Sequence, residues 1–158
     1  MKIAIRKGFG FGLTSGIITT LGLIVGLNYG THSKKIVLGG ILLIAIADAL
    51  SDALGIHISE EAGSKTVTER QIWASTTSTI IFKIIFALTF AIPILLFPLQ
   101  TAIIISILWG ILLLSVFSYY IAKKRQEKPL KAIFEHLLIA GIVIIITYFL
   151  GSWISSWA

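Results

Sequence analysis

Two carboxylates stand in a long apolar segment of this chain, at Asp48 and Asp52. In a helix, residues four apart lie on one face, about 6 Å apart along the axis. Two carboxylates this close repel each other, so one of them is expected to take up a proton easily. This property suits a site that exchanges protons for a cation. The alternative is a protonated pair that only holds neighbouring helices together.

A second group of possible metal ligands follows on the same segment. His57 has Glu60 and Glu61 three and four residues further on, a spacing at which an imidazole and a carboxylate can bind one divalent metal ion. At 100° per residue, His57 and Glu61 point away from the aspartate face. We therefore expect them to form an entry site, apart from the ligands around Asp48; the alternative is an ordinary solvated helix end.

Small and hydroxylated residues mark two of the apolar segments. The glycines expected to allow close helix packing or dimerisation are Gly8, Gly12, Gly16 and Gly55. Thr14 and Ser51 supply hydroxyls that we expect to line a transport pathway together with the aspartates. Lys83, in the third segment, is expected to extend its amine toward the membrane surface rather than to pair with an aspartate.

The composition of the chain indicates the environment in which these residues lie. The chain has 158 residues, of which 56% are hydrophobic and only 13% charged, and its mean hydropathy is +0.97. A soluble domain carries about 25% charged residues, so we predict an all-α integral membrane protein with a single domain, residues 1–158. The chain has no cysteine, which excludes disulfides and thiolate metal sites. Because no phosphate loop, nucleophile elbow or paired histidines occur, we expect neither an enzyme nor a permanently bound cofactor.

Five segments are long enough to cross a membrane as helices, which takes about 20 mostly apolar residues. The predicted spans are residues 8–27, 36–58, 73–97, 99–121 and 132–157. Pro98 is expected to separate the third span from the fourth, because proline has no backbone N–H and disfavours helix before it. Residues 59–72 and 122–131 are the predicted cytoplasmic loops.

The basic residues orient these spans. With the N-terminus in the cytoplasm and the C-terminus on the far side, ten lysines and arginines flank the cytoplasmic ends and two, Lys34 and Lys35, flank the other ends. The ten are Lys2, Arg6, Lys7, Lys65, Arg70, Lys123, Lys124, Arg125, Lys128 and Lys131. The net charge of +6 therefore indicates the topology of the chain, and we expect the basic residues to contact anionic lipid. We expect no nucleic-acid partner.

Three short motifs resemble the vacuolar iron transporter family. Residues 11–14, Phe-Gly-Leu-Thr, are similar to the family's Asp-Gly-Leu-Thr in the first helix, and residues 49–57 to its small-x-Ser-Met-x-x-Gly-x-Tyr in the second. Gly141 and residues 147–151 are similar to its last helix, and the Pro93 and Pro98 pair to its turn between the third and fourth helices. The resemblance extends over nearly the whole chain.

The resemblance implies a five-helix protomer that forms a homodimer, with an ion path between protomers that moves Fe²⁺ or Mn²⁺ out of the cytosol in exchange for protons. Phe11 stands where the family has aspartate, Asp52 where it has methionine, and His57 where it has tyrosine. Carboxylate in place of thioether favours harder ions such as Mn²⁺, Fe²⁺ or Mg²⁺. The family's long Glu-rich cytoplasmic insert is missing between the second and third spans.

We therefore expect a divalent-metal transporter whose metal ligands are Asp48, Asp52, His57, Glu60 and Glu61. The resemblance implies that the transported ion is Fe²⁺ or Mn²⁺ and that it is exchanged for H⁺. The alternative is a membrane scaffold without transport, in which the aspartates hold helices together. Since no organellar targeting segment is visible, a prokaryotic plasma membrane is the expected location.

Overall fold

Six helices form the fold in the computed structural model, which describes residues 1–63 and 66–157. They are α1 (Lys2–Thr31), α2 (Lys34–Gly63), α3 (Glu69–Thr89), α4 (Ala91–Leu96), α5 (Leu99–Lys124) and α6 (Pro129–Ser155). The described residues include no strand. Because α3 and α4 follow one another within a single apolar stretch, Glu69–Leu96, the described residues form five helical stretches long and apolar enough to cross a membrane. The predicted all-α fold with five transmembrane spans is confirmed.

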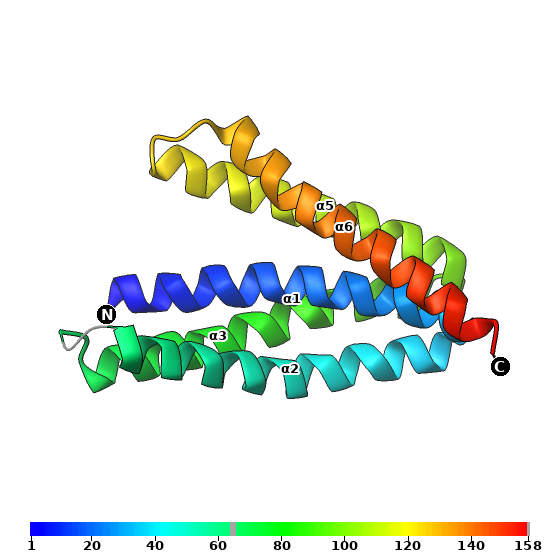
Figure 1. The fold of residues 1–158 in the computed structure, drawn as a ribbon, viewed down its shortest axis with the longest axis horizontal. Coiled ribbons are helices and arrows are strands. Elements are labelled where there is room, and N and C mark those ends of the chain that lie inside the picture. Colours follow the sequence, from blue (N-terminus) through cyan, green and yellow to red (C-terminus); the bar gives the residue numbers. More distant parts are fainter. Residues whose placement is uncertain (64–65, 158) are drawn as a thin grey trace.

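The helices form two groups around α1, as Figure 1 shows. Helices α2 and α3 lie on one side of α1, and the α5–α6 hairpin lies on the other. The N-terminus shares one end of the bundle with the α2–α3 and α5–α6 connections, and the C-terminus lies at the opposite end. Termini at opposite ends are what an odd number of crossings requires.

Most helices extend beyond the predicted spans, so the connections are shorter than expected. Helix α2 continues to Gly63 and α3 begins at Glu69, within the predicted loop 59–72. Likewise α5 ends at Lys124 and α6 begins at Pro129, within the predicted loop 122–131. The reason is physical: hydropathy locates the part of a helix inside the hydrocarbon, whereas charged residues can continue the same helix into water.

Two prolines shape the third span. Proline cannot donate to the carbonyl four residues earlier, and the helix that contains Pro93 is interrupted at Phe90, one turn before it. The predicted span 73–97 is therefore not one continuous helix. Pro98 is the N-cap of α5 and follows Phe97 in extended conformation, with φ −119° and ψ 161°, so the chain turns where the sequence predicts.

Glycines bring α1 onto α3 with almost no side chain between the backbones. A Cβ at Gly12 would lie 2.7 Å from the carbonyl oxygen of Thr79, and one at Gly16 would lie 3.2 Å from that of Lys83. A Cβ at Gly8 would overlap the carbonyl oxygen of Ser75. Three of the four predicted packing glycines therefore form a contact within one chain, which holds the first half of α1 against α3.

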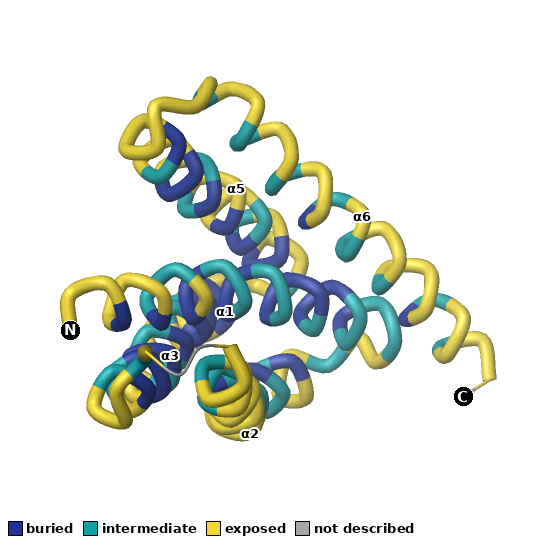
Figure 2. The backbone as a smooth tube through the Cα atoms, turned by 60° about the vertical axis from the view of Figure 1, so that its left-hand side comes forward, coloured by how far each residue is buried: buried dark blue, intermediate teal, exposed yellow. Residues whose placement is uncertain are grey.

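Further along α1, another set of glycines receives α6. A Cβ at Gly151 would overlap the carbonyl oxygen of Gly26, and one at Gly22 would lie 2.8 Å from Val143. The rings of Tyr29 and Tyr148 pack edge to face, with their centroids 4.4 Å apart. Helix α6 thus reaches α1 only near the C-terminal end of the bundle, and most of α6 stays exposed (Figure 2).

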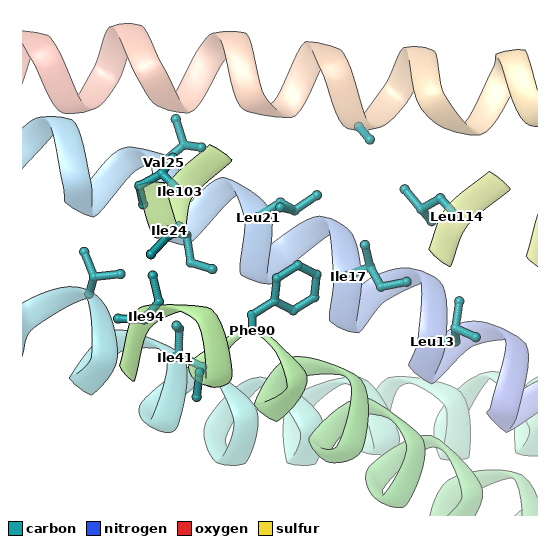
Figure 3. Packing of buried hydrophobic residues seen from close by; sticks show 14 of the residues in the cluster. Leu13, Ile17, Leu21, Ile24, Val25, Ile41, Phe90, Ile94, Ile103 and Leu114 are labelled. Atoms are coloured by element: carbon teal, nitrogen blue, oxygen red, sulfur yellow. The ribbon is translucent and has the colours of Figure 1, made fainter. Parts of the chain in front are cut away.

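Apolar side chains fill the space between α1 and its neighbours. Ile24 of α1 lies by Ile41 of α2 and Ile94 of α4, while Phe90 lies beneath Leu21 (Figure 3). All five of these side chains are at most 1% exposed. By contrast, the outer faces of α2, α5 and α6 expose many large apolar side chains, as expected of surfaces that face lipid.

Gly12→Ala should therefore destabilise the protein, by roughly 1–3 kcal/mol, because overpacking a close contact forces the backbones apart. Gly141→Ala is the matched control, since a Cβ at Gly141 meets no atom within 4 Å and alanine is the better helix former. Thermal unfolding in detergent compares the two. Equal midpoints for both variants would contradict the close α1–α3 contact.

Candidate functional site

A buried lysine joins the two aspartates at the middle of the α2–α3 contact. The Lys83 side chain, from α3, is only 1% exposed. Its Nζ lies 2.5 Å from Oδ2 of Asp48 and also contacts Oδ2 of Asp52. The two carboxylates therefore share one ammonium group, and they face the same neighbour as their spacing in the sequence predicts.

Helix α1 completes the group through Ser15. The Ser15 hydroxyl accepts a hydrogen bond from Lys83 Nζ at 2.9 Å and donates one to Asp52 Oδ2 at 2.6 Å. Three helices thus contribute to what we call the Lys83 cluster: Ser15, Asp48, Asp52 and Lys83. With its three ionisable groups charged, the cluster carries one net negative charge.

Small residues on α2 allow the cluster to form. Ala45, Ala49 and Ala53, four residues apart, are at most 2% exposed and make up most of the buried face of α2. Methyl groups let α2 lie close to its neighbours, and Asp48 and Asp52 flank this alanine stripe. Their carboxylates consequently reach Lys83, while the two side chains stay 29% and 22% exposed.

The expectation that Lys83 extends to the membrane surface is wrong. At 1.5 Å per residue, Lys83 lies about 21 Å along the helix from Glu69, the first residue of α3, which is farther than a lysine side chain reaches. A charge at that depth is stable only when it is paired. The signal was in the sequence: Lys83 is the one basic residue inside a predicted span, and the acidic pair was available to neutralise it.

The ligands predicted at the end of α2 turn to different neighbours. His57 Nδ1 lies 3.0 Å from the hydroxyl of Thr76, and its Nε2 lies 3.5 Å from Glu61 Oε1. Glu60 instead forms an ion pair with Lys7 of α1, at 2.9 Å. His57 and Glu61 are therefore close together, whereas Glu60 links α2 to α1 through its ion pair.

The five predicted metal ligands thus lie in two separate places. Within residues 1–63 and 66–157, no three His, Asp or Glu side chains converge to hold a metal ion. Asp48 and Asp52 supply two carboxylates, with the Ser15 hydroxyl beside them. In one copy of the chain, the Lys83 cluster offers a divalent cation an incomplete set of oxygen ligands.

The remaining predicted residues lie outside the Lys83 cluster. The Thr14 hydroxyl donates to the carbonyl of Gly10 in its own helix, at 2.8 Å, so the adjacent Ser15 takes the place expected for Thr14. Ser51 and Gly55 are exposed on the outer face of α2, and a Cβ at Gly55 would meet no atom within 4 Å. These two residues border the aspartates from outside.

Sequence reasoning also missed a row of buried polar groups on α1. Thr20 and Asn28 are completely buried, and the Thr20 hydroxyl and both polar atoms of the Asn28 side chain have no hydrogen-bond partner among the described residues. The Ser106 hydroxyl of α5 is likewise completely buried and has no hydrogen-bond partner among the described residues. The available signal was that Asn28 is the only asparagine in the chain and lies in an apolar span.

Comparison with protein-family models gives a match over most of the chain. The sequence model of the VIT family matches residues 52–152. This region begins at Asp52, includes Lys83 and ends in α6, so it takes in two of the charged residues of the Lys83 cluster and leaves α1 outside. Among curated proteins, none matches the chain.

Removing the ammonium group should be costly. Lys83→Met keeps most of the side-chain volume but leaves two carboxylates unpaired, so we expect a lower unfolding midpoint and a loss of up to about 3 kcal/mol, the low end for a broken buried pair because the aspartates are partly exposed. Asp52→Asn in the Lys83→Met background should recover part of this loss. The control is Lys123→Met, at the exposed end of α5. Identical midpoints for Lys83→Met and Lys123→Met would show that the pairing contributes no stability.

Proposed function

The chain belongs to the VIT family, whose members transport metal ions across membranes, and we propose that it moves Fe²⁺ or Mn²⁺ out of the cytosol in exchange for protons. The resemblance to the vacuolar iron transporters is thereby confirmed. The protein is a multi-pass integral membrane protein, and the members of its family are transporters rather than enzymes.

The observation that carries the proposal is the pair of carboxylates within the membrane-spanning part of α2. Carboxylate and hydroxyl oxygens are ligands that suit Mn²⁺, Fe²⁺ and Mg²⁺ better than softer metals. Lys83 Nζ contacts both aspartates, so the ammonium group occupies the position that a transported cation would take. An incoming divalent ion would therefore compete with Lys83 for the same oxygen atoms.

Charge balance supports proton exchange. The Lys83 cluster contains two carboxylates and one ammonium group, and a divalent ion would raise its charge by two. Uncompensated charge inside a membrane is unfavourable. Exchanging the ion for protons would return the cluster toward its original charge during each transport cycle.

A homodimer would complete the metal site. The exposed face of α2 beside the aspartates carries small residues four apart, Ala47, Ser51, Gly55 and Ser59, a pattern that allows two helices to pack closely. If α2 of a second copy packs there, it covers the exposed parts of both carboxylates. Four carboxylates would then surround a shared axis, and the ion path would lie between the protomers.

The basic residues support the proposed orientation of the chain, and the resemblance to the family implies transport out of the cytosol. Of the ten basic residues predicted on the cytoplasmic side, Lys65 lies outside the described residues, and the other nine belong to residues 2–7, 70 and 123–131. These segments lie at the end of the bundle that holds the N-terminus, which the positive-inside rule assigns to the cytoplasm. His57 and Glu61 lie at this end of α2 and are the proposed entry site, from which the ion passes to the aspartates. We assign the protein to a prokaryotic plasma membrane.

A membrane scaffold remains the second candidate function, because the contacts of the Lys83 cluster could also serve only to hold helices together. Its salt bridges and hydrogen bonds connect α1, α2 and α3. In a scaffold, the aspartates hold these helices together and no ion moves. The two functions differ in ion flux.

Metal uptake into proteoliposomes tests transport. Wild-type protein is screened with Fe²⁺, Mn²⁺, Co²⁺ and Mg²⁺, with and without a pH gradient, and Fe²⁺ or Mn²⁺ flux should increase with the gradient. Asp52→Asn should reduce flux at least tenfold and leave the oligomeric state unchanged. Glu135→Gln is the matched control, since Glu135 is an exposed carboxylate paired with Lys131 at 3.7 Å.

Transport through the aspartates is contradicted if flux survives both Asp48→Asn and Asp52→Asn. Absence of flux from wild-type protein with all four metals, together with weaker helix assembly in both variants, would favour the scaffold.

Cysteine cross-linking tests the dimer. Because the chain has no cysteine, Ser51→Cys introduces one thiol on the outer face of α2, and mild oxidation in membranes should give a disulfide-linked dimer. Ile146→Cys, at a 52% exposed position of α6, should remain monomeric under the same treatment. Cross-linking at Ile146 but not at Ser51 would place the interface on α6 instead.

A further inference from the structure

A cleft lined by residues of α1 and α5 lies between these two helices, at the end of the bundle that holds the N-terminus, where Figure 1 shows the helices diverging. Its volume is about 710 Å³. Toward the C-terminal end, Gly110 of α5 gives room to Leu21, so that the two helices pack closely. Closer to the N-terminus, the Phe117 ring lies against Gly10, 3.4 Å from where a Cβ would be, and beyond this ring the helices diverge.

The cleft walls are basic at the mouth and aromatic or aliphatic below it. Four basic residues line it, Arg6, Lys7, Lys124 and Arg125. Phe9 lies about one turn deeper in the membrane than Arg6, and Phe117 lies about two turns deeper than Lys124. The two rings meet edge to face, with centroids 5.5 Å apart. Ile121 also lines this deeper part. Polarity therefore changes along the cleft in the same direction as along a phospholipid.

Two of the four basic residues have no acidic partner among the described residues. Lys7 pairs with Glu60 at 2.9 Å, and Arg125 pairs with Glu127 at 3.0 Å. Arg6 and Lys124 form no ion pair with any residue of the described chain. The mouth of the cleft thus carries excess positive charge next to an apolar wall.

We propose that this cleft binds one anionic glycerophospholipid. Its phosphate lies between Arg6 and Lys124, and one acyl chain runs along Phe9, Phe117 and Ile121. Basic pockets between transmembrane helices attract anionic headgroups. A free phosphate ion would satisfy the mouth but would leave the aromatic wall uncovered, so the combination favours a lipid.

The lipid fills the space between the two helix groups. Near the N-terminal end, α5 and α6 diverge from α1, and the lipid supplies the packing that side chains do not. This proposal depends on the membrane location of the chain, and not on metal transport. The two can therefore fail separately.

Native mass spectrometry of the detergent-purified protein tests the site. Phosphatidylglycerol is titrated into wild-type protein, into Arg6→Gln/Lys124→Gln, and into the control Lys2→Gln/Arg70→Gln. The control removes the same two residue types from the same end of the bundle but outside the cleft. We expect the cleft variant to bind the first phosphatidylglycerol about ten to thirty times more weakly, from the usual contribution of basic side chains near a membrane surface, and the control to bind like wild type.

Two further arms separate the sources of the anion. Phosphatidylcholine should bind at least tenfold more weakly than phosphatidylglycerol, and inorganic phosphate should neither bind nor raise the unfolding midpoint at the same concentration. The proposal is overturned if both double variants lose affinity equally, if phosphatidylcholine binds as well, or if inorganic phosphate alone reproduces the effect.

Discussion

A lysine ammonium buried inside a membrane protein has to be neutralised, and this requirement organises the first three long helices. Lys83 is too deep to reach water, so Asp48 and Asp52 must approach it from α2. They can do so only where the helix backbones are close. The alanine stripe of α2 and the glycines of α1 provide that closeness, which makes the ionic cluster and the small-residue contacts parts of one arrangement.

The second helix group is held differently. Helix α6 touches α1 through a backbone contact between Gly26 and Gly151, and α5 packs its apolar side chains against the same helix. Both contacts are strongest toward the C-terminal end of the bundle. The divergence at the other end explains why a cleft lies between α1 and α5, with the basic residues of two helix ends at its mouth.

Structure and transport place opposing demands on the Lys83 cluster. A stable bundle is favoured by a permanent salt bridge, whereas a transporter needs carboxylates that exchange partners. Both aspartates are partly exposed, so one side of the cluster is open, and this is where a cation or a second subunit would approach. Family membership makes transport the leading interpretation, and the geometry supplies candidate residues for it.

Much of this architecture could be predicted from the sequence, because it depends on local properties. Five apolar stretches, a turn at Pro98 and two aspartates on one helix face follow from composition and from the period of the helix. Which side chains and helices contact each other could not be predicted in the same way. That Lys83 pairs with the aspartates, that Ser15 rather than Thr14 joins them, and that Gly12 packs against α3 of its own chain were decided by tertiary structure. Each depends on the rotation and separation of helices distant in the sequence, and only their mutual packing sets these.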